Sequence, residues 1–265
     1  IFLSQLLTGE IGADRIDYLL RDSLHSGVRY GEFDYQRLLH TLDIREVQPE
    51  ETEAEEGSGL EVAVEEGGLH AVEGMILARY FMFLQVYFHK TRRILDIHLT
   101  EFLKKYGGLE GGVFPKDTEA FLEWNDNRVF ALLSKYRDAI ESRRLLSREH
   151  FRVVDETSDH PTEGELIETE WLWKELKDEF GEDIVRLDEK ATTDPYNFKK
   201  PQICIKKAIG RGAGKYILLG SQEDEKSISS ILVKLDTINK QRIYSAPEKR
   251  QDVEEFCKKF RAGNR

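Results

Sequence analysis

The sequence has few cysteines and no long apolar run. Its 265 residues include two cysteines, Cys204 and Cys257, which lie far apart. Such a pair makes no disulfide framework and indicates a reducing compartment, so we expect an intracellular, cytoplasmic protein. No apolar run reaches the roughly 18 residues of a membrane span. The opening "IFLSQLL" is too short for a signal peptide and lacks a basic first region, so we expect no membrane association.

The sequence also has fewer basic than acidic residues. Lysine and arginine number 39 against 50 aspartates and glutamates, which gives a net charge of -11. Nucleic-acid binding needs a positive surface, so this balance argues against it. The same balance is compatible with a local basic pocket for a phosphorylated small molecule.

Several catalytic motifs are missing. The seven histidines form no His-Asp doublet and no His-x-x-x-His pair, and no Cys-x-x-Cys or Ser-His-Asp arrangement is visible. The glycine-rich stretch "GRGAG" at 210–214 lacks the full Gly-x-Gly-x-x-Gly pattern and the context of a phosphate-loop lysine. It therefore favours a hairpin turn.

Helical periodicity is the main signal in the first half of the chain. Residues 12–26 predict a helix that ends at Gly27 in a left-handed conformation. A shorter helix follows, with Asp34 as its N-cap. Alternating segments near 42–66 predict a small hairpin, and the acidic connector 48–60 inside it is expected to be mobile.

The strongest helical signal runs from Met75 to Leu103, apolar on most sides and without proline. It predicts a long core helix that ends at Gly107 and Gly108. Two short helices are predicted after it, the second capped by Asn125 or Asp126. Residues 1–145 are thus predicted to form a mainly α domain, interrupted by the hairpin.

The pattern changes near residue 148. Predicted strands then alternate with helices in the order β-α-β-β-α-β, with one of the helices at 227–239. This order predicts a smaller α+β, ferredoxin-like domain over residues 148–265.

The helix at 12–26 is rich in ionisable side chains. They are Asp14, Arg15, Asp17, Tyr18, Arg21, Asp22 and His25. One interpretation is an active-site wall, in which Asp14 binds a cation, Arg15 pairs with phosphate and Asp22 accepts a sugar hydroxyl. The other is a solvated face with i,i+4 pairs such as Asp17 with Arg21, which spacing alone favours.

The long helix is interrupted by polar and basic residues. They are Arg79, Gln85, His89, Lys90, Arg92 and Arg93. For Arg92 and Arg93 we favour long side chains that cover the core and keep their charges in water. Arg79 lies in the apolar stretch "ILARYFMFLQVYF" and needs a partner, so a binding site and a structural pairing are equally open.

Two segments together resemble a known family. "GADRIDYLLRDSLHSGVRYGEFDYQRLL" followed by "ARYFMFLQVYFHKTRRILDIHL" is similar to the second half of the HD-superfamily phosphohydrolases, in the deoxynucleoside triphosphate triphosphohydrolase (dGTPase-like) branch. The resemblance lies in the pattern Asp-(Arg/Lys)-x-Asp-Tyr-x-x-Arg-Asp, then Gly and Phe-Asp, and in the later Tyr-x-His-Lys. It covers residues 1–105 well, and "TTDPYNFKKP" resembles the C-terminal region of prokaryotic members more loosely.

The resemblance implies roles for the first segment. Asp14 would be the last metal-ligating aspartate of the HD site, and Arg15 would contact phosphate. Tyr18 and Asp22 would hold the sugar, Asp22 through the 3′-hydroxyl. The implied cofactor is a divalent metal ion, with Mn, Fe, Mg, Ni and Zn not distinguished.

The resemblance also implies roles for the second segment. Arg79 would bind phosphate, and Tyr87 would pack on the sugar. His89 and Lys90 would lie near the substrate or a neighbouring nucleotide site. The implied partners are a nucleotide or another phosphorylated small molecule and further copies of the chain in a homo-oligomer.

One departure from the family pattern is large. An HD site also needs a first histidine and a His-Asp doublet ahead of Asp14, and the sequence contains neither. Because the chain begins at Ile1, we expect the C-terminal part of a longer enzyme rather than a degenerate paralogue. We expect little metal retention from this chain alone. The alternative is a non-catalytic nucleotide-binding or oligomerisation module.

Overall fold

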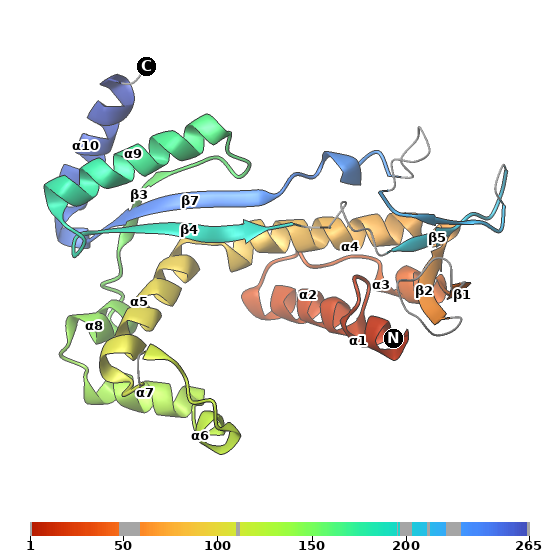
Figure 1. Ribbon diagram of the computed structural model, residues 1–265, viewed down its shortest axis with the longest axis horizontal. Helices are drawn as coiled ribbons and strands as arrows, with labels where there is room; N and C mark the ends of the chain where they lie inside the picture. Colours follow the sequence, from red (N-terminus) through yellow and green to blue (C-terminus); the bar gives the residue numbers. More distant parts are fainter. Residues whose placement is uncertain are drawn as a thin grey trace. The chain divides into compact units, whose positions relative to one another are not determined.

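The chain folds into two compact units, each built from two separate stretches of sequence (Figure 1). A computed structural model describes residues 2–47, 59–109, 112–194, 196, 203–210, 213–220 and 229–263. Unit 1 comprises Ile1–Val86 and Thr193–Ile238, and unit 2 comprises Tyr87–Thr192 and Asn239–Arg265. These limits do not coincide with the predicted boundary near residue 146, which falls inside unit 2.

Unit 1 contains the charged helix predicted at 12–26. Its helices are α1 (Phe2–Thr8), α2 (Ala13–Ser26), α3 (Tyr35–His40) and α4 (Leu69–Met82). Gly27 ends α2 with φ at 68°, as predicted. The Asp34 carboxylate accepts a hydrogen bond from the Arg37 backbone N–H at 2.9 Å, which confirms the predicted cap of α3.

A four-stranded sheet completes unit 1. Its order is β1-β2-β5-β6, and its strands are β1 (Leu42–Val47), β2 (Gly59–Glu65), β5 (Cys204–Lys206) and β6 (Tyr216–Leu218). β1 and β2 are antiparallel, with Leu42 opposite Val64, so the predicted hairpin is confirmed. β5 runs parallel to β2. Most of the acidic connector at 48–60 lies outside the described residues.

The core helix predicted from Met75 to Leu103 is interrupted. α4 continues into a π-helical turn at Phe83–Tyr87, and a new helix, α5 (Lys90–Tyr106), begins after His89. The His89 ring nitrogen Nδ1 accepts a hydrogen bond from the Thr91 N–H at 3.3 Å and so caps α5. Over the described ranges, no single helix is long and apolar enough to cross a membrane. Glu66–Tyr87 and Lys90–Tyr106 are long and apolar enough only when they are taken together, as two helices separated by a bend.

Unit 2 is mainly helical with one small sheet. Its helices are α5, α6 (Thr118–Leu122), α7 (Asp126–Lys135), α8 (Ile140–Leu146), α9 (Glu163–Phe180) and α10 (Arg250–Gly263). The predicted cap of α7 is Asn125, whose side chain accepts from the Arg128 N–H at 3.1 Å. The sheet has the order β3-β7-β4, with β3 (Arg152–Glu156), β7 (Ile238–Ser245) and β4 (Val185–Thr193).

The apolar core of unit 2 lies between this sheet and two helices. α9 contributes Leu172 and Leu176, α10 contributes Val253 and Cys257, and the strands contribute Val185 and Ile243. All six side chains are buried. The amphipathic patterns of α9 and α10 are thus satisfied by one shared core.

The ferredoxin-like arrangement is not confirmed. Two of the strands predicted in this domain, β5 and β6, join the sheet of unit 1 instead of the one containing β3. The helix predicted at 227–239 is wrong over its described part. There, residues 229–239 form a short 3-10 turn at Leu232–Lys234 and then enter β7 at Ile238.

Candidate functional site

The predicted site residues of unit 1 are positioned by a tight turn before α2. The Gly12 N–H donates to the Gly9 carbonyl at 3.0 Å. A side-chain carbon at Gly12 would lie 2.7 Å from the Leu7 carbonyl oxygen, so glycine is required at this approach. On the following helix, Leu19 and Ser23 are buried, which leaves the ionisable stripe on the other side.

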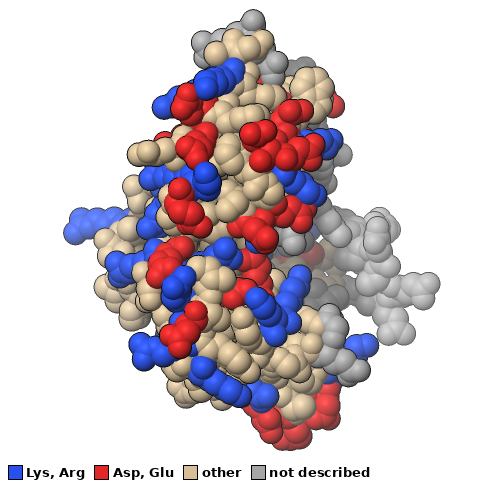
Figure 2. Space-filling view, turned by 90° about the vertical axis from the view of Figure 1, so that its left-hand side faces the viewer, with Lys and Arg blue, Asp and Glu red and all other residues tan. Residues whose placement is uncertain are grey.

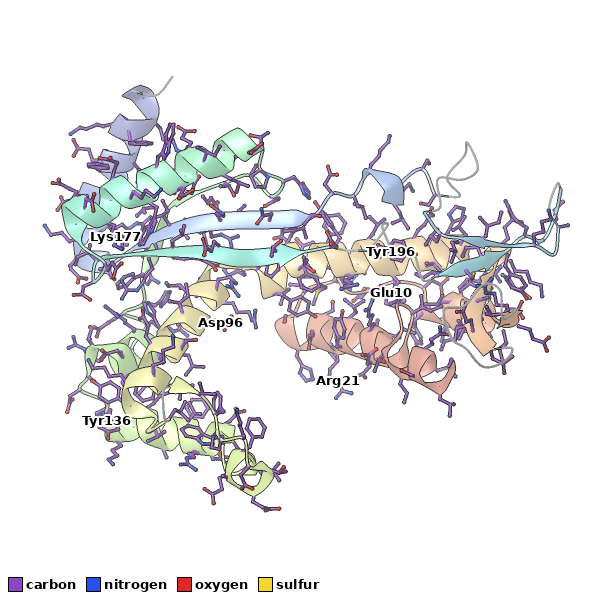
Figure 3. All side chains as sticks on the ribbon, viewed as in Figure 1. Glu10, Arg21, Asp96, Tyr136, Lys177 and Tyr196 are labelled. Carbon is purple, nitrogen blue, oxygen red and sulfur yellow. The ribbon has the colours of Figure 1, made fainter. Side chains whose placement is uncertain are left out.

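Glu10, inside this turn, holds two arginines. Its carboxylate pairs with the Arg15 guanidinium and lies 3.4 Å from the Arg79 guanidinium. The three side chains are only 16–20% exposed. Glu10 lies between α2 and α4 in Figure 3. The predicted phosphate ligands Arg15 and Arg79 are therefore brought together, on one carboxylate that the sequence analysis did not single out.

Tyr18 belongs to the same cluster. Burial raises the pKa of its phenol, while the positive charges of Arg79 and Arg15 act in the opposite direction. The hydroxyl therefore stays protonated near neutral pH and can donate a hydrogen bond. The Arg79 guanidinium also lies 5.6 Å from the centre of the Phe83 ring, a cation–π distance.

The two aspartates of the predicted site differ in exposure. Asp14 is exposed, and its Oδ1 accepts a hydrogen bond from the Arg15 N–H at 2.7 Å. Asp22 is half-buried on α2. No three histidine, cysteine, aspartate or glutamate side chains come together as a metal-binding group in the described part of the chain. The described residues thus offer Asp14 as a single exposed carboxylate, which does not by itself fit a catalytic cation.

One pair on α2 follows the solvated-face interpretation. Arg21 donates to the Asp17 carboxylate at 2.8 and 3.1 Å, and both side chains are more than half exposed. α2 therefore combines a solvated ion pair with the less exposed cluster around Glu10.

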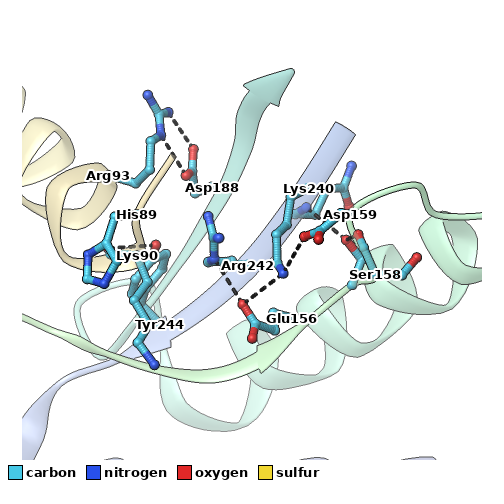
Figure 4. Close-up of polar contacts among 12 residues, drawn as sticks. His89, Lys90, Arg93, Glu156, Ser158, Asp159, Asp188, Lys240, Arg242 and Tyr244 are labelled. Carbon is cyan, nitrogen blue, oxygen red and sulfur yellow. Dashed lines mark hydrogen bonds and ion pairs between the residues drawn. The ribbon is translucent and has the colours of Figure 1, made fainter. Parts of the chain in front are cut away.

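The other three predicted binding residues lie in unit 2. His89 is the cap of α5, and the Lys90 side chain is exposed. The Lys90 carbonyl accepts from the Tyr244 hydroxyl at 3.0 Å (Figure 4). Tyr87 is half-buried, and its carbonyl accepts from Arg92 at 2.7 Å.

The interpretation of Arg93 as a water-exposed side chain is wrong. Arg93 makes two hydrogen bonds to the Asp188 carboxylate, at 2.9 and 2.6 Å (Figure 4). The two side chains are 14% and 2% exposed, so this is a buried ion pair. Arg92 is half exposed, in line with the predicted snorkelling.

Glu10 is the site residue that the sequence analysis missed. Its partners Arg15 and Arg79 lie 5 and 69 positions later, spacings that no helical or strand period connects. The available signal was a carboxylate in the turn sequence "GEIG", directly before a helix rich in arginine and aspartate.

Solved structures of two other proteins resemble the structure of this chain. It shares its fold with a hypothetical protein from Aquifex aeolicus, with a TM-score of 0.72 and 33% identity over 96% of this chain and 59% of that one. A phosphohydrolase, BT4208, from Bacteroides thetaiotaomicron has a TM-score of 0.60 and 21% identity, over 92% of this chain and 63% of that one. At 21% identity, this second likeness shows the fold alone.

The chain belongs to the HD associated region family, which matches residues 33–183, more than half of its length. It is 40% identical over 111 residues to the uncharacterized protein YwfO of Bacillus subtilis. It is 36% identical over 92 residues to the uncharacterized protein MJ1154 of Methanocaldococcus jannaschii. These matches span 41% and 35% of this chain but only 23% and 18% of the relatives.

Proposed function

We propose that the chain is part of a metal-dependent HD-type phosphohydrolase that acts on deoxynucleoside triphosphates. Within that enzyme, the residues of this chain would bind the phosphates and the sugar of the substrate. The observation that supports this proposal most directly is the convergence of Arg15 and Arg79 on the single carboxylate of Glu10.

This arrangement suits a polyanion for an electrostatic reason. Two guanidinium groups share one carboxylate, so the trio carries an excess positive charge. Its low exposure reduces screening by water and salt. Guanidinium groups match phosphate oxygens in planar, two-point hydrogen bonds. An incoming triphosphate would compete with Glu10 for the donors of Arg15 and Arg79.

The sugar would be held beside this charge. Tyr18 offers a protonated hydroxyl within the same cluster, and Asp22 would accept a hydrogen bond from the 3′-hydroxyl. From the family resemblance, we also propose that Tyr87 packs on the sugar and that His89 and Lys90 contact the substrate or a second nucleotide. A homo-oligomeric state and an intracellular location stay predictions.

The metal would need more ligands than the described residues bring together. Asp14 would supply one carboxylate to a divalent ion, whose role in such enzymes is to activate the attacking water. Because a single aspartate does not form such a site, we assign no catalytic step to this chain. Its own residues would bind and orient the nucleotide.

Nucleotide binding by matched arginine variants tests the phosphate role. Arg79→Lys keeps the charge but loses the planar fork, and Arg21→Lys makes the same change in the solvated pair on α2. Titration with a deoxynucleoside triphosphate should show affinity weakened by about 10- to 100-fold in Arg79→Lys, since a charge-assisted hydrogen bond is worth roughly 1.5–3 kcal/mol. Arg21→Lys should bind like the parent chain. Equal affinity of all three proteins would contradict the proposed role of Arg79 in binding phosphate.

The sugar role has a separate test. Asp22→Asn should weaken binding of a deoxynucleotide and leave binding of the matching 3′-deoxy analogue unchanged, because only the former carries the hydroxyl. Equal effects on both ligands would contradict this role while leaving the phosphate proposal intact.

Hydrolysis and metal content separate the enzyme from a binding module. In the longer protein that we expect to contain this chain, Asp14→Ala should abolish both turnover and retention of the divalent ion. If nucleotide binds but the longer protein neither hydrolyses it nor retains metal, the non-catalytic nucleotide-binding module is the correct assignment.

A further inference from the structure

Strand β4 forms an edge of the sheet in unit 2. β4 is nine residues long, and among the strands that the structure describes it has β7 as its single neighbour, in the order β3-β7-β4. An edge strand presents backbone N–H and C=O groups that another strand can pair with. Proteins usually cover a long edge strand or protect it with charged side chains. The side chains around β4 therefore indicate which kind of strand could pair with it.

The backbone contacts show which groups of β4 point outward. The carbonyl of Ile184 accepts a hydrogen bond from the Ala246 N–H, at the end of β7, at 2.8 Å. In an extended strand, successive residues direct their N–H and C=O to opposite sides. Val185, Leu187 and Glu189 therefore direct theirs away from β7. The Val185 carbonyl accepts instead from the side chain of Arg186, at 2.8 Å.

Two grooves flank this edge. One, of about 400 Å³, runs between β4 and α5, and the other, of about 730 Å³, runs between β4 and α9. Asp96 lines the first and Lys177 lines the second, and both are labelled in Figure 3. On β4 the two grooves share Leu187 and Glu189, two of the residues whose backbone groups face away from β7. Side chains of an added strand would alternate between the grooves, as a period of two requires.

The lining of the two grooves has more acidic than basic side chains, which favours a positively charged ligand. Their lining residues include seven carboxylates and five basic side chains. Many of these are paired: Arg186 with Glu101, and Lys174 with Glu170. Within the part of the chain that the structure describes, two carboxylates, Glu189 and Asp183, and one basic side chain, Lys104, line the grooves without an ion pair. Figure 2 shows acidic and basic side chains interspersed over the face of the molecule that it presents.

We propose that the edge of β4 from Val185 to Glu189 accepts an extended, basic peptide segment of a partner protein as an additional strand. Backbone hydrogen bonds to Leu187 and Glu189 would supply affinity, and the flanking grooves would supply the preference for cationic side chains. Glu189, exposed on the strand and common to both grooves, would meet a lysine or arginine of the partner.

A synthetic peptide tests the proposal on the whole chain. The probe is a peptide of alternating lysine and valine, about six residues long, the usual length of a strand. On binding, the amides of Leu187 and Glu189 should exchange with solvent several-fold more slowly. N-methylation of one alternate set of peptide amides should abolish binding, and N-methylation of the other set should leave it, because only one set faces the strand.

Variants of the chain test the charge preference. Glu189→Lys should weaken binding of the peptide by about fivefold, the upper effect of an exposed ion pair, and more at low salt. Glu175→Lys makes the same change in charge at an exposed position of α9 outside both grooves, and it should leave binding unchanged. An alternating glutamate and valine peptide should bind less tightly than the lysine peptide.

Four results would overturn the proposal. They are no binding, equal loss with either N-methylated set, protection of amides away from β4, and equal effects of Glu189→Lys and Glu175→Lys. Protection of Leu187 and Glu189 that appears without peptide, and only as protein concentration rises, would assign this edge to a second copy of the chain instead.

Discussion

The two carboxylate oxygens of Glu101 each have a different hydrogen-bond partner inside unit 2. Arg186 donates to one carboxylate oxygen, and His98 Nδ1 lies 3.2 Å from the other. The Phe151 N–H donates to His98 Nε2 at 3.3 Å, so the ring proton lies on Nδ1 and points to Glu101. Burial lowers the pKa of His98 and favours this neutral form. Burial opposes ionisation of Glu101, but these two donors hold its pKa at about 2.

The low pKa of Glu101 predicts a loss of stability in acid. A carboxylate with a depressed native pKa stabilises the fold fully above its unfolded pKa of 4.5, and this stabilisation is lost as the pH falls towards about 2. The loss should be on the order of 3 kcal/mol, at about 1.4 kcal/mol per pKa unit. Urea denaturation across this window should show that loss in the parent and in Glu175→Gln, but not in Glu101→Gln. Parallel pH curves for all three proteins would contradict the assignment.

The buried pair of Arg93 and Asp188 predicts strong coupling between two residues. Arg93→Met should destabilise unit 2 by roughly 3–5 kcal/mol, because it removes the guanidinium that pairs with the buried Asp188 carboxylate. Adding Asp188→Leu should recover much of this loss. In a double-mutant cycle, the coupling energy should exceed about 1 kcal/mol. Strictly additive effects in urea denaturation would show that the pair is not an energetic unit.

At the scale of the element, the end of α2 depends on one backbone angle. Gly27 has φ at 68°, and a side-chain carbon there would meet no atom within 4 Å. Gly27→Ala should therefore destabilise the fold by about 1 kcal/mol through backbone strain alone. Gly164→Ala, at a normal φ in the first turn of α9, should be neutral or stabilising by up to about 1 kcal/mol. Thermal denaturation of the two variants compares them, and equal shifts would refute the strain argument.

Elements with local signals could be predicted from the sequence. α2 was predictable because its apolar period lies within the helix and the glycine that ends it, Gly27, follows directly. The segment 227–239 was not. Ile231, Leu235 and Ile238 recur as they would along a helix, but they lie beside a 3-10 turn and on β7, and Ile231 is exposed. The helical period therefore did not identify the element.

Long-range partners could not be predicted from the sequence. β2 pairs with β5 through Ala63 and Cys204, residues far apart in the chain, and no pattern within either strand specifies the other. The same holds for the candidate site. The ionic stripe of α2 was visible in the sequence, but the bridge from Glu10 to Arg79 exists only once the chain has folded.

At the scale of the whole molecule, the last stretch of the chain completes unit 2. β7 is the central strand between β3 and β4, and α10 supplies Val253 and Cys257 to the core. All three tryptophans, Trp124, Trp171 and Trp173, lie in the earlier stretch of the same unit. Tryptophan fluorescence therefore reports on unit 2 alone.

This division predicts the effect of a truncation. A chain that ends at Asp236 loses β7 and α10, which leaves β3 and β4 without their shared neighbour and α9 without most of its core. Its tryptophan emission should shift to the red, as for indoles in water, while slow amide exchange in α2 and α4 of unit 1 persists. A chain that ends at Ala262 keeps β7 and nearly all of α10, and its emission should match the parent. Parent-like emission from the shorter chain would show that unit 2 does not depend on β7, and loss of protection in α2 and α4 would show that the two units fold as one.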